Sequence, residues 1–171
     1  ASSIQIIKGI LQKITIEAED INYKDLFFDK VELESNKVKI IFKLNNKDLN
    51  FNNKLIMNFK FSLSERSLKN ILLSNNWNSV TNMMSTELLK QEQLEDVNII
   101  NNEMFIKTSK DNKTNILVEK INIRAEKGRI YFENDNNRKS INVPIEDKVF
   151  INNISIQNNL ITILGNSPIS F

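Results

Sequence analysis

The chain has 171 residues, of which 40% are hydrophobic and 26% charged, a balance that is typical of one globular domain. Its 23 basic and 21 acidic residues give a net charge of +2 without long runs of Lys and Arg, so we expect no nucleic-acid partner. The absence of Cys and His excludes disulfides, thiol nucleophiles, histidine-based triads and ordinary zinc sites, and no glycine-rich phosphate loop occurs.

Strands are expected from about residue 13 to residue 63. Ile14, Ile16 and Ala18 alternate with polar residues, which is typical of a half-buried strand. Similar runs predict three further strands, at 26–34, 37–44 and 54–63. A polar connection is expected at 45–50, and Gly9 argues against a long helix upstream of the first strand.

After the last of these strands, the spacing of apolar residues changes from the strand period to the helical period. Ser64 is expected to cap a helix that begins at Glu65, where a carboxylate favours the positive end of the helix, and that ends near Leu73. A second helix is expected over 77–89, because its apolar residues form roughly one stripe. The helical pair therefore occupies about residues 64–90.

From about residue 97 to residue 164 the sequence again predicts strands, joined by short turns. The clearest hairpin signal is Asn158-Asn159, and further turns are expected at 101–103 and at Lys127-Gly128. Strands, a central helical pair and more strands predict the α+β class with an antiparallel sheet, in a single domain over residues 1–171.

Pairs of carboxylates are the strongest remaining candidates for catalysis. Glu17 and Glu19, like Glu32 and Glu34, are two residues apart on a strand, so each pair shares one face, as a metal site or an acid–base pair requires. The Ile, Val and Leu that alternate with them favour a sheet face that meets water instead. We therefore expect no catalytic residue, no metal site and no cofactor.

An excess of apolar side chains around the junction of strand and helices is more informative. Its aromatic rings and thioethers form surfaces that adapt to irregular apolar partners. These residues either form a plain core between sheet and helices or leave a groove for a ligand. The second interpretation gives a set of candidate lipid-binding residues: Leu55, Met57, Phe59, Phe61, Leu68, Ile71, Leu72, Trp77, Val80, Met83 and Met84.

A family resemblance lies in the order of elements near the N-terminus. The stretch IIKGILQKITIEAEDINYKDLFFDKVELESNKVKI has an apolar pair, a Lys8-Gly9 step, an alternating strand and a second strand after an aromatic turn. The stretch FKFSLSERSLKNILL then gives a strand that ends in a serine-capped helix. In this order, over roughly residues 4–164, the chain resembles the LmeA-like phospholipid-binding family, a group of small bacterial proteins, many cyanobacterial, long of unknown function.

The resemblance implies a curved, mostly antiparallel sheet wrapped around a central helical pair in a single layer-on-helix domain. Such a domain is similar to one half of a tubular lipid-binding protein. It implies a non-enzymatic protein that holds the acyl chains of a phospholipid in an apolar groove. The protein would be peripheral to a bacterial membrane, on its cytoplasmic or periplasmic side, with a phospholipid or the membrane surface as its partner.

The N-terminus departs from the pattern of the family, and two other functions stay open. The chain starts with Ala-Ser-Ser rather than Met and lacks an upstream helical segment expected in the family, so we expect a trimmed N-terminus. An interaction or scaffold module without lipid, whose sheet edge or helical pair binds another protein, is the alternative function. An enzyme that uses a carboxylate pair with Mg²⁺ or Ca²⁺ is the third.

Overall fold

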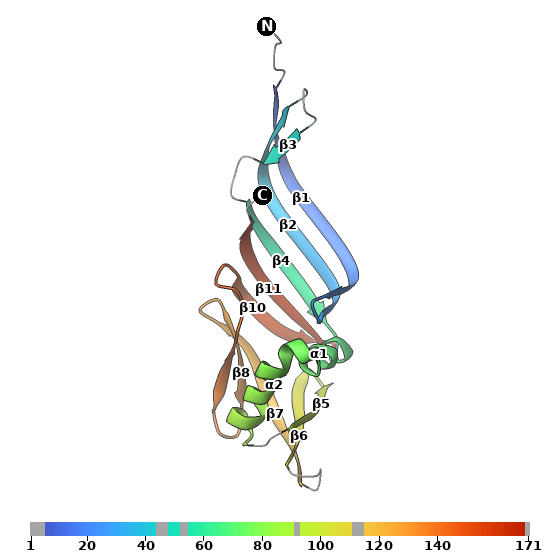
Figure 1. The fold of residues 1–171 in the computed structure, drawn as a ribbon, viewed down its shortest axis with the longest axis vertical. Coiled ribbons are helices and arrows are strands. Elements are labelled where there is room, and N and C mark those ends of the chain that lie inside the picture. Colours follow the sequence, from blue (N-terminus) through green and yellow to red (C-terminus); the bar gives the residue numbers. More distant parts are fainter. Residues whose placement is uncertain (1–5, 44–47, 52–54, 91–92, 111–114, 170–171) are drawn as a thin grey trace.

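Two antiparallel sheets dominate the computed structural model, which describes residues 6–43, 48–51, 55–90, 93–110 and 115–169. The six-stranded sheet has the strand order β1-β2-β4-β11-β10, with β3 paired to β2, and the five-stranded sheet has the order β5-β6-β7-β8-β9. In Figure 1 they occupy the two ends of an elongated molecule, and the helical segment lies where they meet.

The bounds of the elements are as follows. The strands before the helices are β1 (Ile6–Tyr23), β2 (Leu26–Lys43), β3 (Asp48–Phe51) and β4 (Leu55–Leu63). The helical segment contains α1 (Glu65–Leu72), the 3-10 turn η1 (Asn75–Trp77), α2 (Asn78–Met83) and the π-helical turn η2 (Met84–Leu88). The strands after it are β5 (Gln93–Ile100), β6 (Glu103–Lys110), β7 (Asn115–Glu126), β8 (Arg129–Asn134), β9 (Ser140–Val143), β10 (Phe150–Gln157) and β11 (Leu160–Ile169).

The α+β class and the mostly antiparallel strands agree with the sequence prediction, but the strands form two sheets where one was predicted. The helical segment separates β4 from β5, which pairs with β6 instead. The last strand, β11, then returns to pair with β4 and completes the first sheet. Among the described residues, no helix is long and apolar enough to cross a membrane.

Two predicted strand boundaries are wrong. The segments 26–34 and 37–44 belong to one strand, β2, in which Lys37 has a φ of 55° without ending the pairing with β1. The strand β1 begins upstream of residue 13, because its pairing with β2 continues past the regular alternation. The expected polar connection at 45–50 is also wrong in part: 48–50 lie in β3, whereas 45–47 lie outside the described residues.

The register of the six-stranded sheet separates an apolar face from a polar one. One row across five strands consists of Ile16, Leu33, Phe59, Gly165 and Ile151. The next row consists of Glu17, Glu32, Lys60, Leu164 and Asn153. Because neighbouring residues of a strand point to opposite faces, the first row faces the core and the second faces outwards. The buried core itself extends from this inner face through the helices to the five-stranded sheet.

Candidate functional site: an apolar cavity between the sheets

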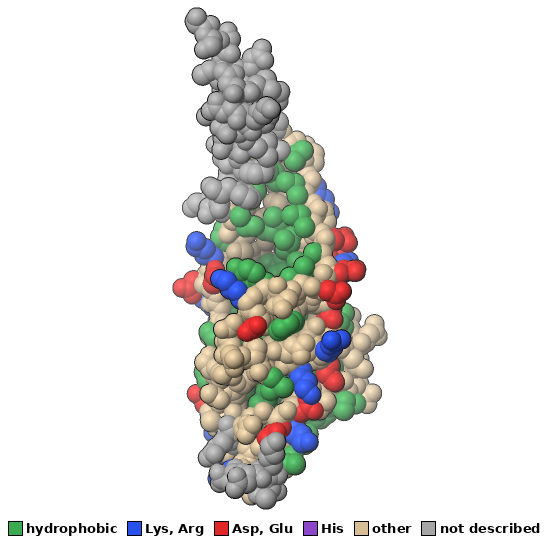
Figure 2. All heavy atoms as spheres, turned by 45° about the vertical axis from the view of Figure 1, so that its right-hand side comes forward, with side chains coloured by type: hydrophobic (Ala, Val, Ile, Leu, Met, Phe, Trp, Pro, Cys, Tyr) green, Lys and Arg blue, Asp and Glu red, His purple; other side chains and the backbone are tan. Residues whose placement is uncertain are grey.

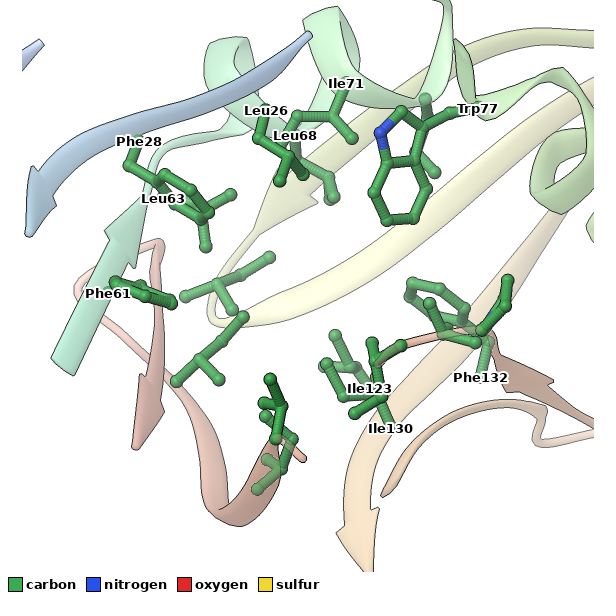
Figure 3. Close-up of a pocket in the computed structure, with 18 of the residues that line it drawn as sticks. Leu26, Phe28, Phe61, Leu63, Leu68, Ile71, Trp77, Ile123, Ile130 and Phe132 are labelled. Atoms are coloured by element: carbon green, nitrogen blue, oxygen red, sulfur yellow. The ribbon is translucent and has the colours of Figure 1, made fainter. Parts of the chain in front are cut away.

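A cavity of about 380 Å³ lies between the inner face of the six-stranded sheet, the helical segment and the strands β7 to β10. Figure 3 shows side chains from these elements pointing towards one another across it. The lining residues are Leu26, Phe28, Phe59, Phe61, Leu63, Leu68, Ile71, Leu72, Trp77, Ile123, Ile130, Phe132, Val143, Pro144, Ile145, Glu146, Val149, Ile151, Ile161 and Ile163. Its volume is within the range of small-molecule sites, about 300–1,000 Å³.

The lining is almost entirely hydrocarbon. Among the described residues that line it, Glu146 is the one charged residue, and the indole of Trp77 is the one other side chain with a polar atom. A polar ligand would lose its hydrogen bonds to water in this cavity without replacing them, which is costly. The arrangement can therefore hold an apolar group, and it has no constellation of side chains for acid–base or nucleophilic chemistry.

The aromatic end of the cavity follows from the alternation of β4. Phe59 and Phe61 point inwards from the same face, with their ring centroids 4.5 Å apart, and Phe28 of β2 lies 4.6 Å from Phe61. Gly165 is the register partner of Phe59 on β11, and a Cβ atom there would clash with the Phe59 ring. The glycine thus leaves the space in which that ring lies.

The helix α1 is fixed between the two sheets by polar contacts at its N-terminus. Ser64 caps it, and the Asp29 carboxylate on β2 accepts hydrogen bonds from the Ser64 backbone N–H (2.5 Å) and hydroxyl (3.0 Å). On the other side, Glu65 accepts from the backbone N–H of Ile99 on β5 at 2.7 Å. These contacts hold the buried face of α1, with Leu68, Ile71 and Leu72, against the cavity.

The loop between β9 and β10 closes the opposite side. The Arg129 guanidinium donates to the Ile145 carbonyl oxygen at 3.1 Å and forms an ion pair with Asp147 at 2.7 Å. The side chains of Ile145 and Val149 are thereby directed into the cavity, where both are half-buried. At the start of β10, the strand that follows this loop, the Ile151 N–H donates to the Gly128 carbonyl at 3.0 Å. This hydrogen bond joins the two sheets.

The structure brings only part of the predicted apolar set to the cavity. The predicted residues that line it are Phe59, Phe61, Leu68, Ile71, Leu72 and Trp77. Those that do not are Leu55, Met57, Val80, Met83 and Met84. Leu55 and Met57 continue the inward-facing positions of β4 beyond the cavity, whereas Val80 and Met84 are buried in the core and Met83 packs half-buried against it.

Sequence reasoning missed the C-terminal half of the site. The residues that β7 to β11 and their loops contribute, such as Ile123, Ile145 and Ile163, did not stand out because isolated isoleucines in strands normally indicate plain core. One signal was available: the C-terminal strands carry Ile on both faces in places, and such strands need cover on both sides.

The apolar surface does not end at the cavity. Figure 2 shows hydrophobic side chains lining a hollow in the surface of the upper sheet. On the inner face of that sheet, Ile16 is 49% exposed and Leu33 and Phe61 are only half-buried. The apolar lining of the cavity therefore continues onto a sheet face that is also apolar and is partly exposed to solvent.

The carboxylate pairs lie away from this cavity, on the outer face of the six-stranded sheet. Lys30 bridges Glu17 (3.4 Å) and Glu32 (3.3 Å), and Lys60 contacts Glu32 at 3.0 Å. The hydrogen bond from Lys60 holds the pKa of Glu32 below its ordinary value. Glu17, Glu32 and Glu34 form ion pairs with lysines. Among the residues that the structure describes, no group of three Asp, Glu, His or Cys could hold a metal ion.

No family model, no curated protein and no solved structure matches the chain.

Proposed function

We propose that this protein is a non-enzymatic lipid-binding protein that holds acyl chains in the apolar cavity, peripheral to a bacterial membrane. The observation that carries the proposal is the composition of the lining, in which Glu146 is the single charged residue among those that the structure describes. Each methylene group removed from water contributes about 0.8 kcal/mol. About ten methylenes would therefore contribute ~8 kcal/mol before the cost of immobilising the ligand is subtracted.

The arrangement of the elements supports the same proposal. The proposal includes the arrangement that the resemblance to the LmeA-like phospholipid-binding family implies, a curved, mostly antiparallel sheet wrapped around the helices with an apolar groove between them. The order of elements from β1 to α1 and the apolar inner row of the first sheet support this reading. The polar headgroup would remain outside, since the lining offers almost no partners for it.

Trp77 provides a direct test, because it is the only tryptophan and lines the cavity. The protein is mixed with phospholipid vesicles that carry bromine at defined acyl depths, at low and high salt, and its fluorescence is followed alongside co-flotation. We expect bromine on the acyl chain to quench Trp77. Flotation that salt reverses, without quenching, would indicate electrostatic docking elsewhere and contradict the cavity as the lipid site.

Matched charge substitutions test the cavity itself. Ile163→Asp places a carboxylate in the lining, and we expect it to lower acyl-chain quenching at least tenfold because a buried charge without a partner is costly. Ile145→Asp repeats the test in a loop, where no strand pairing is at stake. Ile56→Asp is the control, because Ile56 is 60% exposed on the outer side of β4. Folded Ile163→Asp and Ile145→Asp variants that still bind lipid like the control would refute the proposal.

A second candidate function is an interaction module that binds another protein without lipid. One observation favours it: Ile116 and Val118 on β7 are 55% and 58% exposed. In that case Ile116→Asp would abolish capture of a partner, and Ile163→Asp would leave it unchanged. Partner capture that is lost in Ile163→Asp and retained in Ile116→Asp would exclude this candidate.

A further inference from the structure

The outer edge of β1 differs from the other sheet edges among the described residues. Natural proteins protect edge strands by making them short, bulged or covered. The edge strands β3 and β9 have four residues each, and β10 has a register shift between Ile151 and Asn153. The edge strand β5 is bulged between Leu94 and Asp96, and its Ile99 backbone N–H already donates a hydrogen bond to Glu65. β1 is 18 residues long, and of the strands that the structure describes only β2 pairs with it.

The regular part of this edge, residues 10–19, also lacks Pro, Gly and inward-pointing charges, which are among the features that discourage edge pairing. The face that continues the inner row carries Gln12, Ile14, Ile16 and Ala18. Its exposed apolar residues include Ile10 at 59% and Ile16 at 49%. The charges of this segment, Lys13, Glu17 and Glu19, all lie on the outer face.

We propose that a second copy of the chain pairs with this edge, β1 against β1 in antiparallel fashion, about a two-fold axis at Thr15. An axis perpendicular to the sheet keeps both apolar faces on the same side, so each residue pairs with one of the same face. Centred on Thr15, Lys13 lies opposite the partner's Glu17, and Ile14 lies opposite the partner's Ile16. Each pair occurs twice because the interface is symmetric.

Charge complementarity fits this register. Within one chain, Lys13 contacts Glu34 at 2.6 Å and Glu17 contacts Lys30 at 3.4 Å. Pairing at Thr15 would join these contacts into one ladder of alternating sign: Lys60, Glu32, Lys30, Glu17, the partner's Lys13 and the partner's Glu34. A shift of the axis to Ile14 would place Leu11 opposite the partner's Glu17 and lose the ladder. The half-exposed Ile16 is covered by the partner's Ile14 in the proposed register.

Charge reversal tests the interface by sedimentation equilibrium of the full chain. We expect Lys13→Glu and Glu17→Lys each to weaken dimerisation at least tenfold, because like charges then face each other twice. The double variant restores dimerisation, since the interchain pair is re-formed. It leaves both intrachain pairs, with Glu34 and Lys30, as like charges, so a merely intrachain effect would worsen rather than recover. Lys120→Glu, on the other sheet, is the control.

Cross-linking tests the register independently, because the chain has no native Cys. The two copies of Thr15→Cys would lie directly opposite each other, at a separation close to that of a disulfide, and we expect them to oxidise to a covalent dimer. In Leu11→Cys, also exposed, the two sulfurs would lie about 27 Å apart and stay free. The proposal would be overturned if the chain stays monomeric at all concentrations, or if the charge reversals leave the dimerisation constant unchanged. Equal cross-linking of the two cysteine variants would also overturn it.

Discussion

At the scale of single residues, the cavity depends on a glycine as much as on its aromatic rings. Gly165 on β11 lies under the ring of Phe59, and an added Cβ would also meet the backbone carbonyl of Phe150. A flexible side chain can move aside, whereas a backbone carbonyl in a paired strand cannot move without disturbing the register of β10 and β11. The shape of the aromatic end is therefore set by the smallest residue near it.

We predict that Gly165→Ala lowers the free energy of unfolding by about 1–3 kcal/mol, the usual cost of overpacking a close contact. Urea unfolding followed by Trp77 fluorescence measures this difference. Ser167→Ala on the same strand is the control, because within the described part of the chain its hydroxyl donates only to the neighbouring Pro168 carbonyl, at 3.4 Å. Equal stability of the two variants would mean that Phe59 and the β10 backbone can yield to an extra methyl group.

At the scale of elements, α1 is the part that couples both sheets to the cavity. Asp29 holds its cap from the first sheet, and on the other side Lys69 forms an ion pair of 2.6 Å with Asp96 of β5. Hydrogen bonds to Asp96 from the Lys69 ammonium and the Val97 backbone N–H lower the pKa of this carboxyl below its ordinary 3.8, against the opposing effect of partial burial.

This lowered pKa predicts a pH dependence of stability. Asp96 binds its proton less tightly in the folded chain than in the unfolded one, so its contribution is complete well above pH 4 and disappears as the pH falls through the folded value. At pH 7 we expect Asp96→Asn to be less stable than the parent by up to about 1 kcal/mol, and the difference to vanish near pH 2.

Urea unfolding from pH 2 to pH 7 checks this expectation. Asp147→Asn is the matched control, since Asp147 pairs with Arg129 but its side chain is 97% exposed. An unchanged gap between parent and Asp96→Asn over the whole range would show that the Lys69–Asp96 pair does not anchor α1 electrostatically.

At the scale of the whole molecule, a pair of asparagine turns links the two sheets. The backbone N–H of Asn102 donates to the side-chain oxygen of Asn159 at 2.9 Å, and the backbone N–H of Asn159 donates to that of Asn102 at 2.8 Å. Both residues have positive φ, 63° and 57°, which asparagine tolerates better than most residues. The hairpin turns of β5–β6 and β10–β11 thus hold each other near the end of the cavity-forming strands.

We predict that Asn159→Gly costs roughly 1 kcal/mol of stability beyond Asn158→Gly, because it removes one of these two hydrogen bonds. Glycine accepts the positive φ of both positions, and both substitutions raise the entropy of the unfolded chain equally, so the comparison isolates the hydrogen bond. Amide hydrogen exchange at Asn102 should accelerate in Asn159→Gly alone. Similar exchange in both variants would show that the turns do not hold each other in solution.

The features that the sequence by itself determined are local ones. The turn at Asn158-Asn159 follows from the tolerance of asparagine for left-handed backbone, and the start of α1 follows from a serine cap before a helical apolar stripe. Inward positions such as Phe59 and Phe61 follow from alternation along a single strand. These signals lie within a few residues of one another, so they can be read without knowing the partners.

Only the tertiary structure decided which apolar residues became core and which line the cavity. Phe61 and Met84 were both predicted to face a ligand groove, yet Phe61 lines the cavity and Met84 is fully buried, because different elements face them. The division into two sheets was equally hidden, since β4 pairs with β11, a strand about a hundred residues later. Strand pairing and cavity volume depend on contacts between distant segments, and no local period encodes them.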